Sequence, residues 1–240
     1  MSGITKEKVL SLLEAGNDGR KYARQFFELV PDWLMDTFQP VELKENTIFI
    51  RENTKVELVY ILLKGAVKAT DYRVFGITYD FMRFHPMMAF GSMEILLGHL
   101  FYKTTLITVT PCTLLVTAKS NFETWLSQDM KAYRLESNTM VSYLLEQGRR
   151  ERIFLFMQGM DRVMYLFMQL YEESVSEEEN KVFKITRQEM SDYTGLCVKT
   201  INRSVLKLEE EGYISRNGTK IVISAQQYQE MKAYIVEKIG

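Results

Sequence analysis

Cysteine and histidine are scarce in this sequence, with two of each among 240 residues. Cys112 and Cys197 are too few and too far apart to form a disulfide framework, a four-cysteine iron–sulfur cluster or a structural zinc site. His85 and His99 do not form a His-x-His pair, so an enzyme that holds a catalytic metal in a β-roll is not expected either. We expect a protein that is not an enzyme, with no catalytic residues and no metal site.

Long apolar runs are absent too. No segment approaches the roughly 20 apolar residues of a transmembrane helix, and the sequence does not begin with a signal peptide. We therefore expect a cytoplasmic protein that has no membrane partner.

The chain has no excess of either charge, because 30 basic residues face 31 acidic ones. The net charge of −1 gives no indication that the protein binds nucleic acid. The balance differs locally: seven basic side chains lie between Lys184 and Lys220, against five acidic ones. Three of those acids, residues 209–211, come late in the segment, which leaves a mildly positive face suited to phosphate contacts.

Residues 187–207, RQEMSDYTGLCVKTINRSVLK, have the pattern of two short helices joined by a tight turn. Met190 and Tyr193 lie three apart on one face of the first helix, and Gly195 follows where the chain must turn sharply. After Leu196, which we expect to fill the junction, apolar residues recur at helical spacing at Ile201, Val205 and Leu208. This pattern predicts a DNA-binding helix-turn-helix, with a purely structural helix–loop–helix corner as the alternative.

The segment that follows favours the DNA-binding interpretation. Gly212 ends the second helix, a strand begins at Tyr213, and Asn217-Gly218 is a strong hairpin signal before a returning strand at 220–223. A helix-turn-helix followed directly by a hairpin predicts a winged helix. We expect a last helix at 226–239.

Between residues 41 and 117 the apolar pattern changes to a period of two. Short β-branched and aromatic runs predict strands at 41–43, 48–50, 59–63, 66–69, 79–84 and 106–109, with one of the turns at Phe75-Gly76. Such short, evenly spaced strands predict a small antiparallel barrel or jelly roll, interrupted by a short helix within 91–103. Helices at 4–15 and 20–29 are expected to pack on it.

A long helix is predicted from Gln128 to Met157, after a short helix that Ser120 is expected to cap. No proline interrupts it, and apolar or small residues recur every three or four positions at Met130, Tyr133, Ser137, Met140, Val141, Leu144, Gly148 and Leu155. This spacing predicts a dimerisation seam, with burial against the chain's own roll as the alternative. Gly159 is expected to interrupt the helix. The fold class is α+β, with predicted domains at 1–127, 128–158 and 159–240.

In this order, a β-roll, a long helix, a glycine-marked hinge and a winged helix resemble the Crp/Fnr family of transcription regulators. Residues 184–189, KITRQE, are similar to the family's entry into its helix-turn-helix, and residues 64–68, KGAVK, resemble its roll strand. Phe90-Gly91 and Arg162 also fall where the family has these residue types. The resemblance implies a homodimeric regulator bound to double-stranded DNA at a pseudo-palindromic operator.

The effector site departs from the family pattern. Its cyclic-nucleotide binders have a Gly-Glu pair, whose carboxylate binds the ribose, and a later Arg-Ser pair that holds the phosphate. Here these positions read Gly91-Ser92 and Tyr102-Lys103, and lysine supplies only a point charge. The resemblance therefore implies a pocket that holds a small, rather apolar effector other than cyclic AMP, or none. Its expected residues are Gly91, Ser92, Glu94, Tyr102, Lys103, Tyr143, Leu144 and Gln147.

Three alternatives for the effector follow from the same comparison. A cyclic nucleotide would need Glu94 and Lys103 as displaced ligand-binding residues. Oxygen sensors of the family need an N-terminal cysteine cluster, which is excluded because no cysteine precedes Cys112. Haem sensing would need axial ligands, and we expect the only two histidines, His85 and His99, to be turn residues.

The recognition helix also departs from the family's usual Arg-Glu pair and later Arg, since the corresponding residues are Val198, Lys199 and Arg203. The resemblance implies base contacts by Arg203 with guanine and by Lys199 with guanine or a phosphate. Asn202 could pair with adenine or be simply solvated, and Val198 could touch a thymine methyl. Contacts with the DNA backbone are expected from Thr186, Arg187, Gln188, Thr200, Lys207, Arg216 and Lys220.

Two other classes share parts of this pattern. A regulatory cyclic-nucleotide module of a kinase or channel would not end in a winged helix, and an effector-independent DNA-binding protein would not use the pocket. RNA polymerase is an expected partner if the protein activates transcription. The sequence leaves the cofactor or effector unknown.

Overall fold

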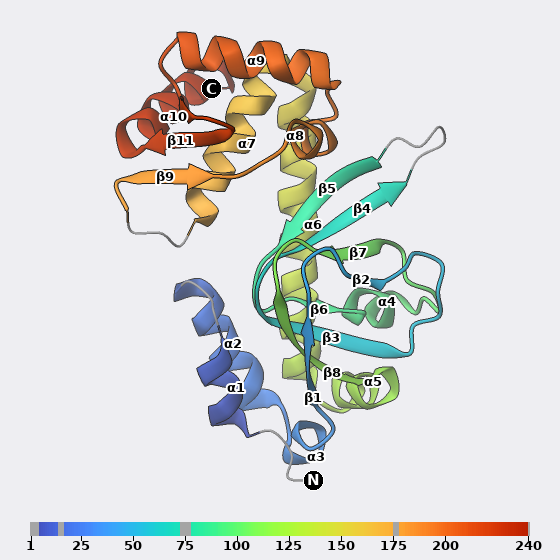
Figure 1. Ribbon diagram of the computed structural model, residues 1–240. Helices are drawn as coiled ribbons and strands as arrows, with labels where there is room; N and C mark the ends of the chain where they lie inside the picture. Colours follow the sequence, from blue (N-terminus) through green and yellow to red (C-terminus); the bar gives the residue numbers. More distant parts are fainter. Residues whose placement is uncertain (1–4, 14–16, 73–77, 175–177, 240) are drawn as a thin grey trace. The chain divides into compact units, whose positions relative to one another are not determined.

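The computed structural model describes residues 5–13, 17–72, 78–174 and 178–239 (Figure 1). The chain divides into two compact units, Met1–Leu145 and Glu146–Gly240. Helix α6 (Met130–Phe156) contributes to both units. The division at 127 and 158 expected from the sequence therefore stays a prediction.

The first unit contains two four-stranded antiparallel sheets, which confirms the predicted roll. One sheet has the order β1 (Gln39–Leu43), β8 (Cys112–Ala118), β3 (Leu58–Lys64), β6 (Ala89–Phe90). The other has the order β2 (Ile48–Ile50), β7 (Thr105–Thr108), β4 (Val67–Tyr72), β5 (Thr78–Phe84). The turn predicted at Phe75-Gly76 lies outside the described residues.

Two of these strands, β6 and β8, were not predicted. Five residues of β8 in a row, Cys112 to Val116, are apolar or threonine, and four of them are buried, so the strand lacks an alternating pattern. The neighbouring strand β3 shows that both faces of this sheet are covered. Ile61 and Leu63 belong to a cluster formed with helices, while Leu62 belongs to the cluster between the sheets. A sheet that is covered on both faces needs apolar residues at successive positions.

Helices cover one face of this sheet. They are α1 (Lys6–Leu12), α2 (Asn17–Leu29), α3 (Asp32–Met35) and α5 (Lys119–Gln128), and α4 (Ser92–Leu97) lies within the roll as predicted. Phe26 and Trp125 meet edge-to-face at 5.2 Å in the buried cluster, so the N-terminal helices pack as expected. Ser120 does not cap α5, because the helix already begins at Lys119, with Ala118 in the N-cap position.

Helix α6 begins at Met130 because Asp129 leaves the helical conformation and its Oδ1 accepts a hydrogen bond from the Lys131 N–H at 2.8 Å. Within the first unit the helix has one buried face and one exposed apolar face. Ala132 and Glu136 are buried, and Tyr143 stacks on Phe84 at 5.4 Å. The second face is exposed and bears Met130, Tyr133, Val141 and Leu144, with exposed fractions of 77%, 43%, 54% and 57%.

The second unit holds α7 (Gly159–Glu173), α8 (Arg187–Thr194), α9 (Val198–Glu210) and α10 (Ala225–Ile239) around a three-stranded sheet. The sheet order is β10 (Ser215–Asn217), β11 (Lys220–Ser224), β9 (Asn180–Phe183). The hairpin was predicted, but β9 was not, although exposed and half-buried residues alternate along it.

Gly159 does not interrupt a helix as expected. The break falls at residues 157–158, and Gly159 is the first residue of α7. Its role is close packing, since a Cβ there would lie 3.0 Å from the Thr200 side chain on α9. Arg162 secures the break, donating hydrogen bonds to the carbonyl oxygens of Phe154 and Thr194 at 2.9 and 3.3 Å.

Candidate functional site

Two short helices of the second unit form a helix-turn-helix with well-defined ends. Helix α8 starts with a capping box, in which the Thr186 hydroxyl accepts from the Glu189 N–H and a Glu189 carboxylate oxygen accepts from the Thr186 N–H. The helix ends at Gly195, whose φ of +70° lies in the left-handed region that favours glycine. Ser191 then donates to the Leu196 carbonyl oxygen at 2.5 Å and closes the turn.

Helix α9 presents the predicted two faces. Ile201, Val205 and Leu208 have no exposed surface, which confirms the inward pattern. The opposite face carries the four residues expected to contact bases, and all of them are exposed: Val198, Lys199, Asn202 and Arg203. The second helix of the motif therefore offers hydrogen-bond donors, an amide and a small apolar group on its solvent side.

One predicted base contact is coupled to a predicted backbone contact. The Arg187 Nε donates a hydrogen bond to the Asn202 Oδ1 at 3.0 Å, which holds the Asn202 amide in one orientation. An amide whose oxygen already accepts this bond still has its two N–H donors for a ligand. This pair could not be predicted from sequence spacing, because its members are 15 residues apart on different helices.

Several residues expected to contact the DNA backbone hold partners within the chain. Gln188 donates to Asp192 at 2.7 Å, and the Cys197 thiol and Thr200 hydroxyl lie 3.3 Å apart. Lys207 pairs with Glu211 at 3.5 Å, and Arg216 pairs with Glu209. Lys220 is exposed on the hairpin. These pairs lie at the surface, so phosphate oxygens can compete for the same cations.

Cys197 is a residue of this surface that the sequence did not single out. It is the N-cap of α9, and its thiol is exposed. Hydrogen bonds from Thr200 lower the pKa of the thiol below its ordinary value. Its position just before the first apolar residue of α9 could have predicted an N-cap, although cysteine is not a usual capping residue.

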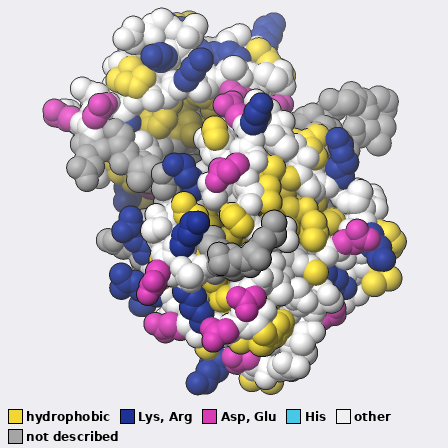
Figure 2. All heavy atoms as spheres, turned by 60° about the horizontal axis from the view of Figure 1, so that its bottom comes forward, with side chains coloured by type: hydrophobic (Ala, Val, Ile, Leu, Met, Phe, Trp, Pro, Cys, Tyr) yellow, Lys and Arg dark blue, Asp and Glu magenta, His cyan; other side chains and the backbone are white. Residues whose placement is uncertain are grey.

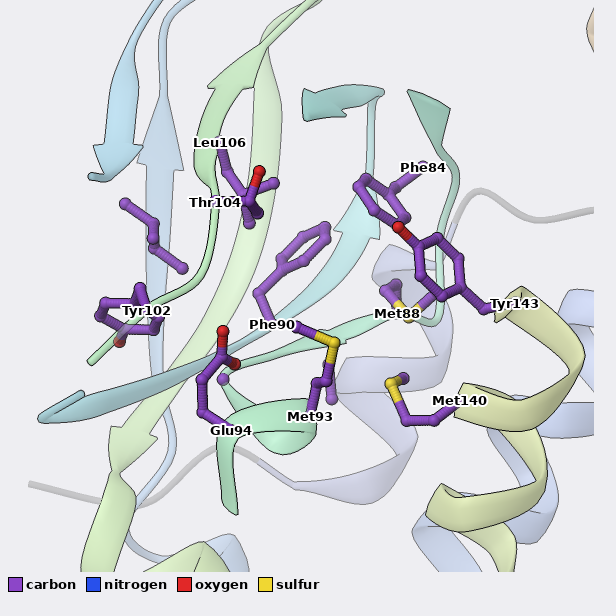
Figure 3. Close-up of a pocket in the computed structure, with 13 residues that line it drawn as sticks. Phe84, Met88, Phe90, Met93, Glu94, Tyr102, Thr104, Leu106, Met140 and Tyr143 are labelled. Carbon is purple, nitrogen blue, oxygen red and sulfur yellow. The ribbon is translucent and has the colours of Figure 1, made fainter. Parts of the chain in front are cut away.

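A cavity of about 50 Å³ lies in the first unit, between the roll and α6 (Figure 3). Strands and loops supply most of its wall, α4 supplies Met93 and Glu94, and α6 supplies Met140 and Tyr143 (Figure 3). The remaining lining residues are Ile50, Phe84, Met88, Ala89, Phe90, Gly91, Tyr102, Thr104 and Leu106.

Four of the predicted pocket residues line this cavity: Gly91, Glu94, Tyr102 and Tyr143. Gly91 has a φ of +99°, and a Cβ there would lie 2.9 Å from the Leu58 carbonyl oxygen, so glycine is required. The other predicted residues lie differently. Ser92 is buried and donates to the Ala89 carbonyl oxygen at 2.8 Å, and the side chains of Lys103 and Leu144 are exposed. Gln147 belongs to the second unit, so its place at the cavity stays a prediction.

Comparison with known proteins matches both units. Residues 40–129 match the cyclic nucleotide-binding domain, and residues 161–228 match the Crp-like helix-turn-helix domain. The chain belongs to the Crp/Fnr family of transcription regulators.

Solved structures show the same fold. The c-di-GMP responsive global regulator CLP of Xanthomonas campestris is 19% identical, with a TM-score of 0.71 over 84% of this chain and 99% of its own. FixK2 of Bradyrhizobium japonicum is 16% identical, with a TM-score of 0.70 over 82% and 96%. A putative Crp/Fnr regulator of Eubacterium rectale is 14% identical, with a TM-score of 0.70 over 91% and 95%. No curated protein matches the chain significantly.

The cavity of this Crp/Fnr regulator has few charged groups in its wall. Among the described lining residues there is no lysine or arginine, and Glu94 is the one carboxylate. Burial raises the pKa of Tyr143 to about 12 and raises that of Tyr102 as well, so both phenols are neutral. The cavity wall therefore combines neutral apolar surface with a single negative group.

Two further findings bear on other classes of function. Over the described ranges, no three side chains of histidine, cysteine, aspartate or glutamate are placed to hold a metal ion. In the same ranges, no helix is both long and apolar enough to cross a lipid bilayer. Among the described side chains drawn in Figure 2, basic and acidic groups are interspersed.

Proposed function

We propose that the protein is a homodimeric regulator that binds a pseudo-palindromic DNA operator and is controlled by a small effector other than cyclic AMP. The observation that carries the proposal is the exposed face of α9, where Lys199, Asn202 and Arg203 are open to solvent while the opposite face is buried. Side chains in this position on a second helix of a helix-turn-helix read base edges in the major groove.

The roles on DNA differ along α9. Arg203 lies in the middle of the helix, and a bidentate pair with guanine discriminates between bases by about 1–3 kcal/mol. Lys207 lies one turn further on, beside Glu211, and is suited to a phosphate. The pair of Arg187 and Asn202 supports the assignment of Asn202 as a base contact, because Arg187 fixes the amide before DNA arrives.

The exposed face of α6 supports the homodimer. Met130, Tyr133, Val141 and Leu144 are large apolar side chains left in solvent at helical spacing, while a different face of the helix covers the roll. If a second copy of α6 packs against the first across a two-fold axis, the exposed apolar face of each copy is buried against the other. Such a dimer presents two recognition helices to two half-sites.

The cavity supports an effector other than cyclic AMP. A cyclic nucleotide carries a phosphate anion, and the described lining residues offer it no cation. A runner-up remains, because Glu94 does line the cavity and could bind a ribose hydroxyl. Its proposed partner Lys103 contributes a backbone N–H to Glu94 at 3.1 Å, while its side chain is exposed.

The decisive experiment distinguishes side chains that recognise bases from side chains that bind backbone phosphates. A pool of random duplexes is selected on the full-length protein, and the enriched operator is then tested with Arg203→Ala and Lys207→Ala. Arg203→Ala should lose the preference for one base pair in each half-site, about 10- to 100-fold, and keep its non-specific affinity. Lys207→Ala should weaken all sequences alike and lower the slope of log affinity against log salt by about 0.9 per lost contact.

Glu210→Ala serves as a matched control, since it removes another charged side chain from the last turn of α9 without removing a cation. If no operator emerges from selection, the proposed function is wrong. If the two variants behave alike on a panel of operators, Arg203 is a phosphate anchor and specificity rests on Lys199, Asn202 or DNA shape.

A further inference from the structure

The cavity of the first unit contains two polar groups whose hydrogen-bonding capacity the described residues leave largely unused. Glu94 is only 3% exposed, and among the described residues its carboxylate accepts a single hydrogen bond, from the Lys103 N–H. A carboxylate can accept about four hydrogen bonds, so most of its capacity is free. Figure 3 shows the carboxylate directed into the space between Tyr102, Phe90 and Met93.

Thr104 is the second such group. Its hydroxyl oxygen is buried and has no hydrogen-bond partner among the described residues. A buried hydroxyl without a partner is costly, and native proteins keep few of them. Thr104 lines the same cavity as Glu94, so both groups are available to one ligand.

The rest of the wall selects against anions. Phe84, Met88, Phe90 and Leu106 are apolar, and the positive charge of Lys103 lies on an exposed side chain outside the lining. An anion would meet the Glu94 carboxylate in a poorly solvated space without a counter-charge, which is strongly unfavourable. A neutral hydroxyl or a protonated amine would instead donate a hydrogen bond to that carboxylate.

The size of the cavity limits the apolar part of the ligand. About 50 Å³ is small, but Met88, Met93 and Met140 line it, and methionine side chains adapt easily to a new shape. Met140 and Tyr143 lie on α6, so a ligand that displaces them acts on the helix that bears the exposed seam.

We infer that the effector is a small apolar molecule that carries an amino or hydroxyl donor and no anionic group, with the donor bound by Glu94 and Thr104. This inference rests on the proposed function only in calling the ligand an effector. The ligand class itself concerns the cavity alone.

Three probes of matched shape test the ligand class on the full-length protein: benzylamine, benzyl alcohol and benzoate. Binding is followed by saturation-transfer NMR and by the shift in melting temperature at millimolar concentrations. Benzylamine should bind at least about 10-fold more tightly than benzoate, because a charged hydrogen bond replaces charge repulsion. Benzyl alcohol should lie between them.

Two variants that preserve side-chain shape locate the contact. Glu94→Gln keeps an acceptor for the Lys103 N–H and should weaken benzylamine about 10-fold while changing benzyl alcohol little. Thr104→Val should raise the melting temperature of the free protein by about 2–4 °C, because it removes an unsatisfied buried hydroxyl, and should weaken benzyl alcohol. Lys103→Ala, which removes only an exposed side chain, should change neither probe.

The inference is overturned if benzoate or cyclic AMP binds as tightly as benzylamine, if no probe binds, or if Lys103→Ala abolishes binding. Operator affinity measured with and without benzylamine tests the proposed function separately. If the probe binds through Glu94 but leaves operator affinity unchanged, the inferred ligand class is supported. The proposal that the cavity controls DNA binding is then wrong.

Discussion

The two thiols of this chain have opposite environments. Cys112 is 1% exposed, and burial raises its pKa, whereas Cys197 is exposed and hydrogen bonds from Thr200 lower its pKa. Because the thiolate is the reactive form, Ellman's reagent should modify one thiol per chain rapidly and the other only after unfolding. Cys197→Ser should abolish the rapid phase, and Cys112→Ala should retain it.

Modification of Cys197 should also weaken operator binding, because the adduct stands at the N-terminus of α9. Operator affinity of the modified protein, compared with that of Cys197→Ser treated in the same way, measures this effect. Two equally fast thiols, or full affinity after modification, would contradict the assignment.

A second prediction at the residue scale concerns Glu136, a carboxyl that is only 1% exposed on α6. Its Oε1 accepts a hydrogen bond from the Tyr22 hydroxyl at 2.7 Å, while its Oε2 has no partner among the described residues. Burial raises the pKa of Glu136, and the hydroxyls of Tyr22 and Ser92 oppose this shift less strongly.

The sign of the pH effect follows from the raised pKa. The folded state binds this proton more tightly than the unfolded state does, so the contribution of Glu136 to stability is full below the ordinary carboxyl pKa and is lost as the pH rises through the raised value. Glu136→Gln removes the effect. Its melting temperature relative to wild type should therefore rise between pH 5 and pH 8, with a gain from removing a poorly satisfied carboxylate of about 1–3 kcal/mol.

The exposed Glu28→Gln on α2 is the matched control and should show no such trend. Thermal unfolding across this pH range measures both variants. A Glu136→Gln variant that is equally destabilised at every pH would show that the carboxylate contributes more through its hydrogen bonds than it costs by burial.

At the scale of elements, α6 carries a prediction about assembly. Leu144 lies in the exposed seam, and in a two-fold interface each substitution occurs twice. Leu144→Glu should weaken the dimer by at least about 100-fold, because two carboxylates would be buried opposite each other without partners. Sedimentation at micromolar concentration measures the change.

Ser142→Glu is the control for this prediction, since Ser142 is also exposed on α6 but lies away from the seam. It should remain dimeric. If the wild-type protein is a monomer at micromolar concentration, with and without DNA, the seam does not mediate self-association and the proposed dimer fails.

At the scale of the whole molecule, the proposed two-fold dimer predicts the spacing of the operator half-sites. Two recognition helices related by a two-fold axis reach half-sites about one helical turn apart. Insertion of half a turn, about 5 base pairs, between the half-sites puts them on opposite faces of the duplex. Affinity should then fall to that of a single half-site.

A control operator in which the same central bases are substituted without any insertion keeps the spacing and should bind normally. Titration of fluorescent duplexes measures both. Equal affinity for the spaced and unspaced operators would mean that each winged helix binds independently.

Elements with local signals could be predicted from the amino-acid sequence alone. The helix-turn-helix depends on Gly195 and on apolar residues three or four apart, and the wing depends on Asn217-Gly218, so neighbouring residues were enough to predict both. Four large apolar residues of the seam expected on α6 are exposed, but Met140 lines the cavity instead, and the dimer stays a prediction. Strand β8 was missed, since a strand buried on both faces shows no alternation.

The composition of the cavity and the partners of the side chains proposed to face DNA depend on the three-dimensional fold. Glu94 and Thr104 share a wall with Tyr143, although α6 lies far from them in the sequence. The pairs of Arg187 with Asn202 and of Glu136 with Tyr22 likewise join separate helices. Hydrogen bonding and burial depend on distance in space, and spacing along the chain carries that information only within an element.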